Sequence, residues 1–126
     1  MSEINRLTFK EMCAKFDVTP RTLRYYEYIE LLTPEKEGRA RFYTAREVAR
    51  MTLILRGRRF GFSLEEIRQW LLMYRADGTR QQLDHFLGLA DRQLHDLQRQ
   101  RQELDITIAD LHALRETTVG ALKNLA

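Results

Sequence analysis

The last third of the chain carries a seam of residues at alternating spacings of four and three, and this pattern restricts the fold most strongly. Its twelve positions are Leu83, Leu87, Ala90, Leu94, Leu97, Arg101, Leu104, Ile108, Leu111, Arg115, Thr118 and Leu122. All of them except Arg101, Arg115 and Thr118 are apolar. Such spacing is typical of a coiled-coil helix that buries one stripe against a partner helix. We therefore predict a helix over 80–116, about 37 residues or ~55 Å long. A small head domain cannot cover that length, so a homodimer is expected.

The large aliphatic side chains of the seam make up the predicted dimer interface. Its residues are Leu83, Leu87, Leu94, Leu97, Leu104, Ile108 and Leu111. Each contributes about 1.5–3 kcal/mol when buried, so together they offset an association cost of roughly 4–15 kcal/mol. Arg101 and Arg115 interrupt the seam. We interpret them as laying their aliphatic stems along the stripe, with a register-setting or effector-sensing role as the alternative.

Helix caps divide the rest of the chain. Four segments place Ser or Thr three residues before Glu or Gln, the pattern of a capping box: Thr8–Glu11, Thr44–Glu47, Ser63–Glu66 and Thr79–Gln82. Thr19 followed by Pro20 gives a fifth helix start. The helices expected from these starts span 8–16, 20–28, 45–59, 64–75 and 80–116. The predicted fold is therefore mainly all-α.

The stretch TPRTLRYYE, residues 19–27, predicts a short helix that binds nucleic acid. Leu23 and Tyr26 share one face of this helix, whereas Arg21, Arg24 and Tyr25 point largely away from it. The very short turn before Thr19 is the connection expected in a helix-turn-helix. An exposed face of two arginines and a tyrosine is suited to reading DNA.

The segment after this helix predicts a basic two-stranded wing. In TPEKEGRARFY, residues 33–43, a glycine bend is followed by Arg39, Arg41 and Tyr43 in alternation. Seven arginines and one acid, Glu47, lie between residues 39 and 59, although the whole chain carries only +3. A patch this basic attracts polyanions. A solvated basic surface and a plain charged loop are the alternatives.

Several other classes of protein are not supported by the sequence. It contains no apolar run long enough for a membrane span and no secretory leader, so a cytoplasmic protein is expected. The single cysteine, Cys13, fits a reducing compartment, and we interpret it as a core residue. No Gly-rich phosphate loop, metal-binding histidine pair or catalytic constellation is apparent. We expect no enzyme, no cofactor and no bound metal.

Four motifs together resemble the MerR family of bacterial transcription regulators: TPRTLRYYE, the wing ending in RFY, the helix start YTAREV, and RGRRFGFSLEEIRQWL. The resemblance covers residues 7–75, and the segment LRGRRFGFSLEEI is most similar to regulators of leucine and isovalerate catabolism. It implies a winged helix-turn-helix over 1–76, followed by a dimerisation helix over 77–126 that forms an antiparallel coiled coil. It also implies binding to a pseudo-palindromic promoter in double-stranded DNA, together with RNA polymerase.

The resemblance also assigns roles to individual residues. Arg21 and Arg24 would meet base edges or phosphates, Tyr25 and Tyr26 would border the DNA backbone, and Arg41 and Tyr43 would contact it from the wing. Arg58 would hold a phosphate. Thr22, Arg39 and Arg59 complete the predicted DNA-binding set.

The chain departs from the family's sensor types. It has no cysteines where the metal sensors and iron-sulfur members carry them, and we expect no appended effector domain of the drug-binding type. Metal, redox and multidrug sensing by the family's known routes are therefore not expected, and the small-molecule effector is unknown. Two rival functions stay open from the sequence: an architectural DNA-bending protein, and a coiled-coil adaptor whose basic head docks an acidic protein.

Overall fold

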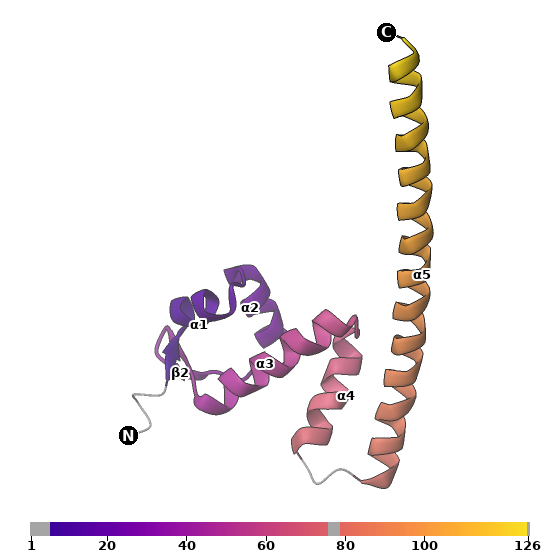
Figure 1. Cartoon of the computed structure of the whole chain (residues 1–126). Coiled ribbons are helices and arrows are strands. Elements are labelled where there is room, and N and C mark those ends of the chain that lie inside the picture. Colours follow the sequence, from indigo (N-terminus) through magenta and orange to yellow (C-terminus); the bar gives the residue numbers. More distant parts are fainter. Residues whose placement is uncertain (1–5, 76–78, 126) are drawn as a thin grey trace. The chain divides into compact units, whose positions relative to one another are not determined.

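The computed structural model describes residues 6–75 and 79–125, which form two compact units that divide between Thr79 and Arg80. The predicted domain boundary between residues 76 and 77 lies outside the described residues. The elements of the first unit, here called the head, are β1 (Leu7–Thr8), α1 (Phe9–Phe16), α2 (Pro20–Tyr28), β2 (Glu35–Glu37), β3 (Ala40–Tyr43), α3 (Ala45–Phe60) and α4 (Leu64–Arg75). The second unit is the single helix α5 (Arg80–Asn124) (Figure 1).

The head is a helix-turn-helix with a small sheet beside it. Helix α1 packs against α2 and against strands β1 and β3, while α3 packs against β3 and α4. The fold is thus mostly helical, and the prediction of a winged helix-turn-helix head followed by a long helix is confirmed. Helices α1 to α4 begin and end within one residue of the predicted positions.

The sheet has three antiparallel strands in the order β1-β3-β2, one more than the predicted two-stranded wing. The additional strand, β1, is two residues long and pairs Leu7 with Tyr43 and Thr8 with Phe42. Strands β2 and β3 form a hairpin in which Glu37 opposes Ala40, leaving Gly38 and Arg39 in the loop. Gly38 has φ +61, a conformation that glycine adopts without steric cost.

The loop between α2 and β2 is fastened to the core of the head. Leu31 and Leu32 are buried, and three side chains from α3 and α4 bind the loop backbone. Arg50 Nε donates to the carbonyl of Leu31 at 2.6 Å, Arg68 donates to the carbonyl of Ile29, and Glu47 accepts from the amide of Thr33. These bonds hold the C-terminal end of α2 in place.

Of the four predicted capping boxes, two are confirmed, one is wrong, and Thr79–Gln82 stays a prediction. The boxes Thr8–Glu11 and Ser63–Glu66 both form, with hydrogen bonds of 2.8 and 3.1 Å in each. Thr44 begins α3, but its side chain makes no cap hydrogen bond. Because Glu47 is buried and accepts from the Thr33 amide, it serves the neighbouring loop instead of the start of its own helix.

Helices α1, α2 and α3 all end in the Schellman pattern, in which a left-handed residue lets two backbone amides reach back to free carbonyls. The left-handed residues are Asp17, Glu30 and Gly61, with φ of 52°, 64° and 91°. After Glu30, for example, the Leu31 amide donates to the carbonyl of Tyr26 at 2.9 Å. Glutamate carries a Cβ that disfavours this conformation, so Glu30 stores local strain.

Replacing Glu30 by glycine is expected to stabilise the head by ~0.5–1 kcal/mol, because the relief of strain exceeds the extra freedom of glycine in the unfolded chain. The midpoint of urea unfolding measures the change. Asp17→Gly is the matched comparison and should gain less, since aspartate tolerates left-handed φ better. A loss of stability in Glu30→Gly would show that the Glu30 side chain makes a compensating interaction.

Helices α3 and α4 approach closely at Gly57. A Cβ built on this residue would lie 2.8 Å from Cγ1 of Ile67 and 3.2 Å from Cζ3 of Trp70. The aromatic rings of Phe60, Phe62 and Trp70 continue this contact, with centroids 5.9 to 6.3 Å apart. Glycine at position 57 therefore sets the distance between the two helices.

Helix α5 extends further than the sequence predicted. It ends at Asn124, not at residue 116, because no proline interrupts the region and the seam continues through Thr118 and Leu122. Gly120 does not break it. Among the described residues, no helix is both long enough and apolar enough to pass through a membrane.

Candidate nucleic-acid interface

Helix α2 is built to present one polar face. The hydroxyl of Thr19 accepts from the amide of Thr22 at 3.1 Å, and Pro20 occupies the first turn, so the start of the helix is fixed. Leu23 is fully buried and Tyr26 is 5% exposed, so the helix is held to the core by these two side chains. The opposite face, with Arg21, Arg24 and Tyr25, is exposed as the sequence predicted.

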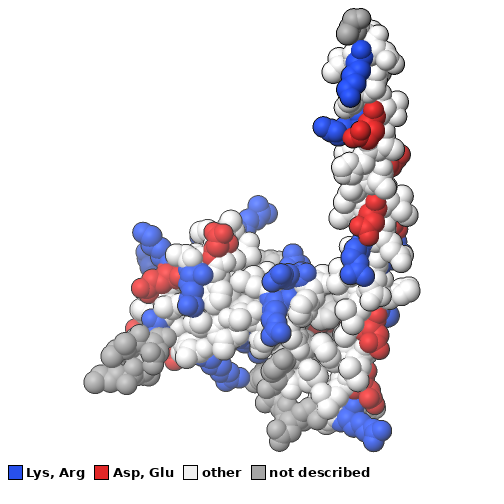
Figure 2. All heavy atoms as spheres, in the orientation of Figure 1, with Lys and Arg blue, Asp and Glu red and all other residues white. Residues whose placement is uncertain are grey.

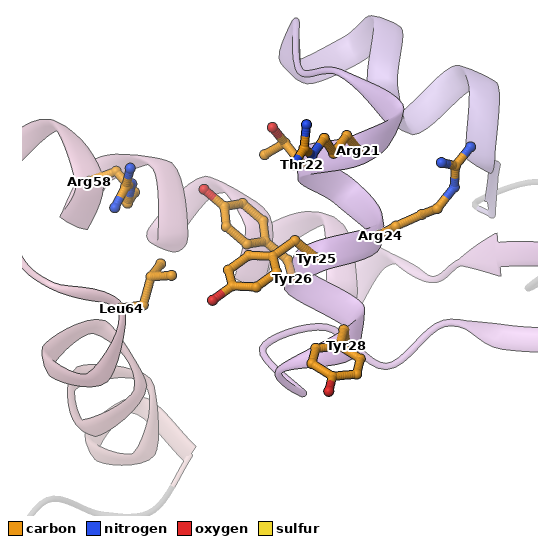
Figure 3. A pocket seen from close by; sticks show the side chains of 8 residues that line it. All are labelled: Arg21, Thr22, Arg24, Tyr25, Tyr26, Tyr28, Arg58 and Leu64. Carbon is orange, nitrogen blue, oxygen red and sulfur yellow. The ribbon is translucent and has the colours of Figure 1, made fainter.

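An open hollow of about 560 Å³ lies along this exposed face. It is lined by Arg21, Thr22, Arg24, Tyr25, Tyr26, Tyr28, Arg58 and Leu64. Figure 3 shows the rings of Tyr25 and Tyr26 extending from α2 towards the side on which Arg58 and Leu64 lie. The lining contains three arginines and no acidic residue, so its potential favours an anion.

The hollow combines residues that the sequence predicted separately. Six predicted DNA-binding residues line it, including Arg58, which comes from the last turn of α3. Arg58 and Arg59 are both exposed at this helix end, where cations interact favourably with the helix dipole. Arg59, however, does not line the hollow.

Two lining residues, Tyr28 and Leu64, were not predicted. Tyr28 is 83% exposed at the end of α2, and Leu64 begins α4. Helical periodicity contained the signal for Tyr28, because it follows Arg21 and Tyr25 at the spacing i, i+4, i+7 on one face. Leu64 had no such signal, since its place in the hollow depends on how α4 packs.

The predicted wing residues occupy three different environments. Arg39 is exposed in the hairpin loop, and Arg41 is half-buried on β3. Arg41 Nε lies 3.1 Å from Oε1 of Glu27, and its guanidinium carbon lies 5.4 Å from the centre of the Phe9 ring. None of the wing residues lines the hollow.

The prediction for Tyr43 is wrong, because this residue is buried. It was expected to contact the DNA backbone, but its side chain is fully buried and its hydroxyl donates a hydrogen bond to Oε2 of Glu27. Burial, followed by the hydrogen bond to Glu27, raises the pKa of the Tyr43 phenol far above its usual value. Tyr43 therefore packs and fastens the wing from inside. Tyr26 is nearly buried as well, so only its edge facing the hollow is available to a ligand.

Arg6 fastens the outer strand of the wing. Its guanidinium lies 3.1 Å from the carboxylate of Glu35 and 2.8 Å from that of Glu37, and it stacks 4.2 Å from the centre of the Phe42 ring. Both carboxylates belong to β2. The pairing partly offsets the negative charge that this strand would otherwise bring to a DNA-binding surface.

Cys13 is half-buried on α1. Burial raises the pKa of its thiol, while nearby Arg24 opposes that rise. The thiolate, which is the reactive form of cysteine, is therefore disfavoured. This agrees with the interpretation of Cys13 as a packing residue.

Helix α5 exposes the seam along its length in the single chain. Its predicted interface residues are between 40% and 65% exposed: Leu83, Leu87, Leu94, Leu97, Leu104, Ile108 and Leu111. A soluble monomer rarely leaves so long an apolar stripe in water. Arg101 and Arg115 are exposed as well, and Arg115 lies 3.1 Å from Glu116. Figure 2 shows several basic side chains and a few acidic ones over the head, and acidic and basic ones interspersed along α5.

Comparisons with known proteins support a regulator. The family described as "MerR HTH family regulatory protein" matches residues 7–73, and the one described as "MerR, DNA binding" matches residues 48–114. The HTH-type transcriptional regulator ZntR of Escherichia coli K12 is 32% identical over 112 residues, which are 87% of this chain and 79% of ZntR.

Two solved structures are similar in fold. A MerR family transcriptional regulator from Bacillus cereus gives a TM-score of 0.69 at 28% identity, covering 82% of this chain and 75% of that one. HiNmlR, a MerR family regulator that lacks the sensor domain and is bound to promoter DNA, gives 0.60 at 20% identity, with coverages of 82% and 78%.

Proposed function

Because the chain belongs to the MerR family of DNA-binding transcriptional regulators, we propose that it binds a pseudo-palindromic promoter site as a homodimer. The hollow on α2 carries this proposal, since it brings three arginines and three tyrosines, all from α2 except Arg58 of α3, onto one surface without an acidic residue. Arginine forks suit guanine edges and phosphates, and tyrosine hydroxyls suit phosphates. Within each head, α2 is the recognition helix.

The dimer forms through the seam of α5. Two copies of the seam bury each other's leucines, and the family resemblance implies that the two helices run antiparallel. The paired recognition helices then read half-sites about one helical turn apart, ~34–36 Å. Phosphate contacts from the wing and from Arg58 and Arg59 hold each head in register on the duplex.

The bound dimer acts on transcription by deforming DNA. Bending and untwisting the spacer between the two promoter elements brings both within reach of RNA polymerase, at a cost on the order of 1–6 kcal/mol. The numerous phosphate contacts offset that cost. This role requires no catalytic step by the protein itself, and it places the protein with the genome in the cytoplasm.

The regulated genes are proposed from one segment. LRGRRFGFSLEEI, residues 55–67, resembles the corresponding part of regulators of leucine and isovalerate catabolism. It joins the last turns of α3 to the start of α4 and includes Arg58 and Leu64 of the hollow. In vitro transcription with candidate small molecules of that catabolism tests this finer assignment.

Replacing Arg24 by alanine is expected to weaken operator binding by ~1–3 kcal/mol and to reduce discrimination against other sequences, because Arg24 reads base edges. Arg58→Ala removes the same charge but should weaken binding to all sequences alike, because it contacts phosphate. Fluorescence anisotropy on operator and random duplexes measures both variants. Arg92→Ala on α5 is the control for loss of charge outside the head. Equal losses on both duplexes for Arg24→Ala would contradict the role in base reading.

Footprinting on the DNA that flanks the protein's own gene tests the function as a whole. A single protected palindrome between promoter elements supports the regulator. Diffuse protection would indicate an architectural DNA-bending protein instead. Absence of protection on every duplex at low salt would contradict DNA binding and favour an adaptor.

A further inference from the structure

Glu27 joins the recognition helix to the wing. It lies in the last turn of α2, and its two carboxylate oxygens have different partners on β3. Oε2 accepts the hydroxyl of Tyr43, and Oε1 lies 3.1 Å from Nε of Arg41. Tyr43 and Arg41 are two residues apart on the strand, so they project from the same face. One carboxylate therefore fixes two neighbouring side chains of the wing.

The bridge is shielded from solvent. The side chain of Glu27 is 11% exposed, that of Arg41 is 34% exposed, and Tyr43 is fully buried. The burial that raises the Tyr43 pKa also keeps its phenol protonated, so the hydroxyl remains a donor to Glu27. Charge-assisted hydrogen bonds in such surroundings are stronger than those in water.

Arg41 of the bridge and Arg24 of the recognition helix lie near a common ring, that of Phe9. The guanidinium carbon of Arg24, from α2, lies 5.5 Å from the centre of the Phe9 ring, and that of Arg41, from β3, lies 5.4 Å from it. Phe9 begins α1, against which β3 packs. Arg24 and Arg41 are thus held near each other although they belong to different elements.

We infer that Glu27 is a positioning residue for DNA recognition, which fixes the wing against the recognition helix so that Arg24 and Arg41 meet one duplex together. The inference rests on the proposed function. The positioning role and the charge of Glu27 predict opposite effects on DNA binding when the carboxylate is removed. A carboxylate near a DNA-binding surface repels phosphate, so its removal alone should tighten binding to any DNA. A positioning role requires that its removal weakens binding to the correct sequence.

The test compares two isosteric variants of the full-length protein. A preferred duplex is first selected from a random-sequence library with the unaltered protein, and a scrambled duplex of equal composition serves as the reference. Glu27→Gln keeps an oxygen for Tyr43 but loses the ion pair with Arg41. Glu30→Gln, three residues further along and exposed, removes the same charge and is the matched control.

Glu27→Gln is expected to weaken binding to the selected duplex by about tenfold, since the coupled contacts are lost together. Binding to the scrambled duplex should be unchanged or tighter, because the protein becomes more positive. Glu30→Gln should weaken neither. In an Arg41→Ala background, Glu27→Gln should have little further effect on the ratio of the two affinities, because this substitution removes the ion pair with Arg41 and keeps an oxygen for Tyr43.

Three outcomes would overturn the inference. In the first, Glu27→Gln behaves like Glu30→Gln on both duplexes. In the second, its effect is undiminished in the Arg41→Ala background. If Glu27→Gln fails to fold, as judged by circular dichroism, Tyr43→Phe replaces it. This variant keeps the net charge and removes the hydrogen bond between the Tyr43 hydroxyl and Glu27. The third outcome is that Tyr43→Phe leaves the ratio of the affinities for the selected and scrambled duplexes unchanged. If the unaltered protein selects no duplex at all, the proposed function itself fails.

Discussion

Glutamate at both Leu97 and Leu104 is expected to convert the proposed dimer into monomers at micromolar concentration. Both residues belong to the seam of α5, where each leucine contributes about 1.5–3 kcal/mol on burial. Each substitution also places a carboxylate in an apolar interface, where its desolvation is costly. Sedimentation velocity of the full-length protein measures the change in mass.

Ile106 provides the matched control for this experiment. It is 69% exposed, close to Leu104 in sequence, but lies on the opposite side of the helix from the seam. Leu104→Glu alone should therefore weaken the dimer, while Ile106→Glu should leave it intact. A dimer that persists in the double variant would contradict the seam as the interface, and equal effects at 104 and 106 would mean that general helix damage is responsible.

Replacing Gly57 by alanine is expected to destabilise the head by ~2 kcal/mol, a typical cost of overpacking a core. The new Cβ would lie 2.8 Å from Cγ1 of Ile67, and both Ile67 and Trp70 are buried with little room to move. Alanine ordinarily stabilises a helix relative to glycine by roughly 0.5–1 kcal/mol, so a loss must come from the contact with α4. Thermal unfolding at fixed protein concentration measures the change.

Gly88 on α5 gives the control with the opposite sign, because no heavy atom lies within 4 Å of its added Cβ. Gly88→Ala should therefore raise the stability of α5, because alanine favours the helix and meets no clash. The double variant Gly57→Ala, Ile67→Ala should lose less stability than the sum of the losses in the two single variants, because the smaller side chain at position 67 makes room for the new methyl group. Strict additivity would contradict the proposed clash.

The elements that local signals define were predicted well from the sequence. The bounds of α2 follow from Thr19 and Pro20, and the burial of Leu23 and Tyr26 follows from their spacing. These signals act within one turn of helix, so they do not depend on the rest of the fold. The exposure of Arg21 and Arg24 was predicted from the helical spacing of α2, whereas Arg58 was assigned only through the family resemblance.

The features that depend on distant partners were not predicted. Strand β1 has two residues and exists because Leu7 pairs with Tyr43, which follows the helix-turn-helix in the sequence. Glu47 has the spacing of a capping residue but is drawn to the Thr33 amide instead. The alternation of Arg41 and Tyr43 along β3 was predicted, but the burial of Tyr43 and the contacts of both side chains with Glu27 were not. Only the tertiary structure decides which face of a strand is buried.

Helix α5 has a consequence for how the protein responds to its own abundance. Its 45 residues carry most of their leucines in water when the chain is alone, so the proposed pairing of two such helices would follow mass action. The protein's concentration would then set the fraction of chains in the proposed dimer, and with it the occupancy of the proposed promoter site.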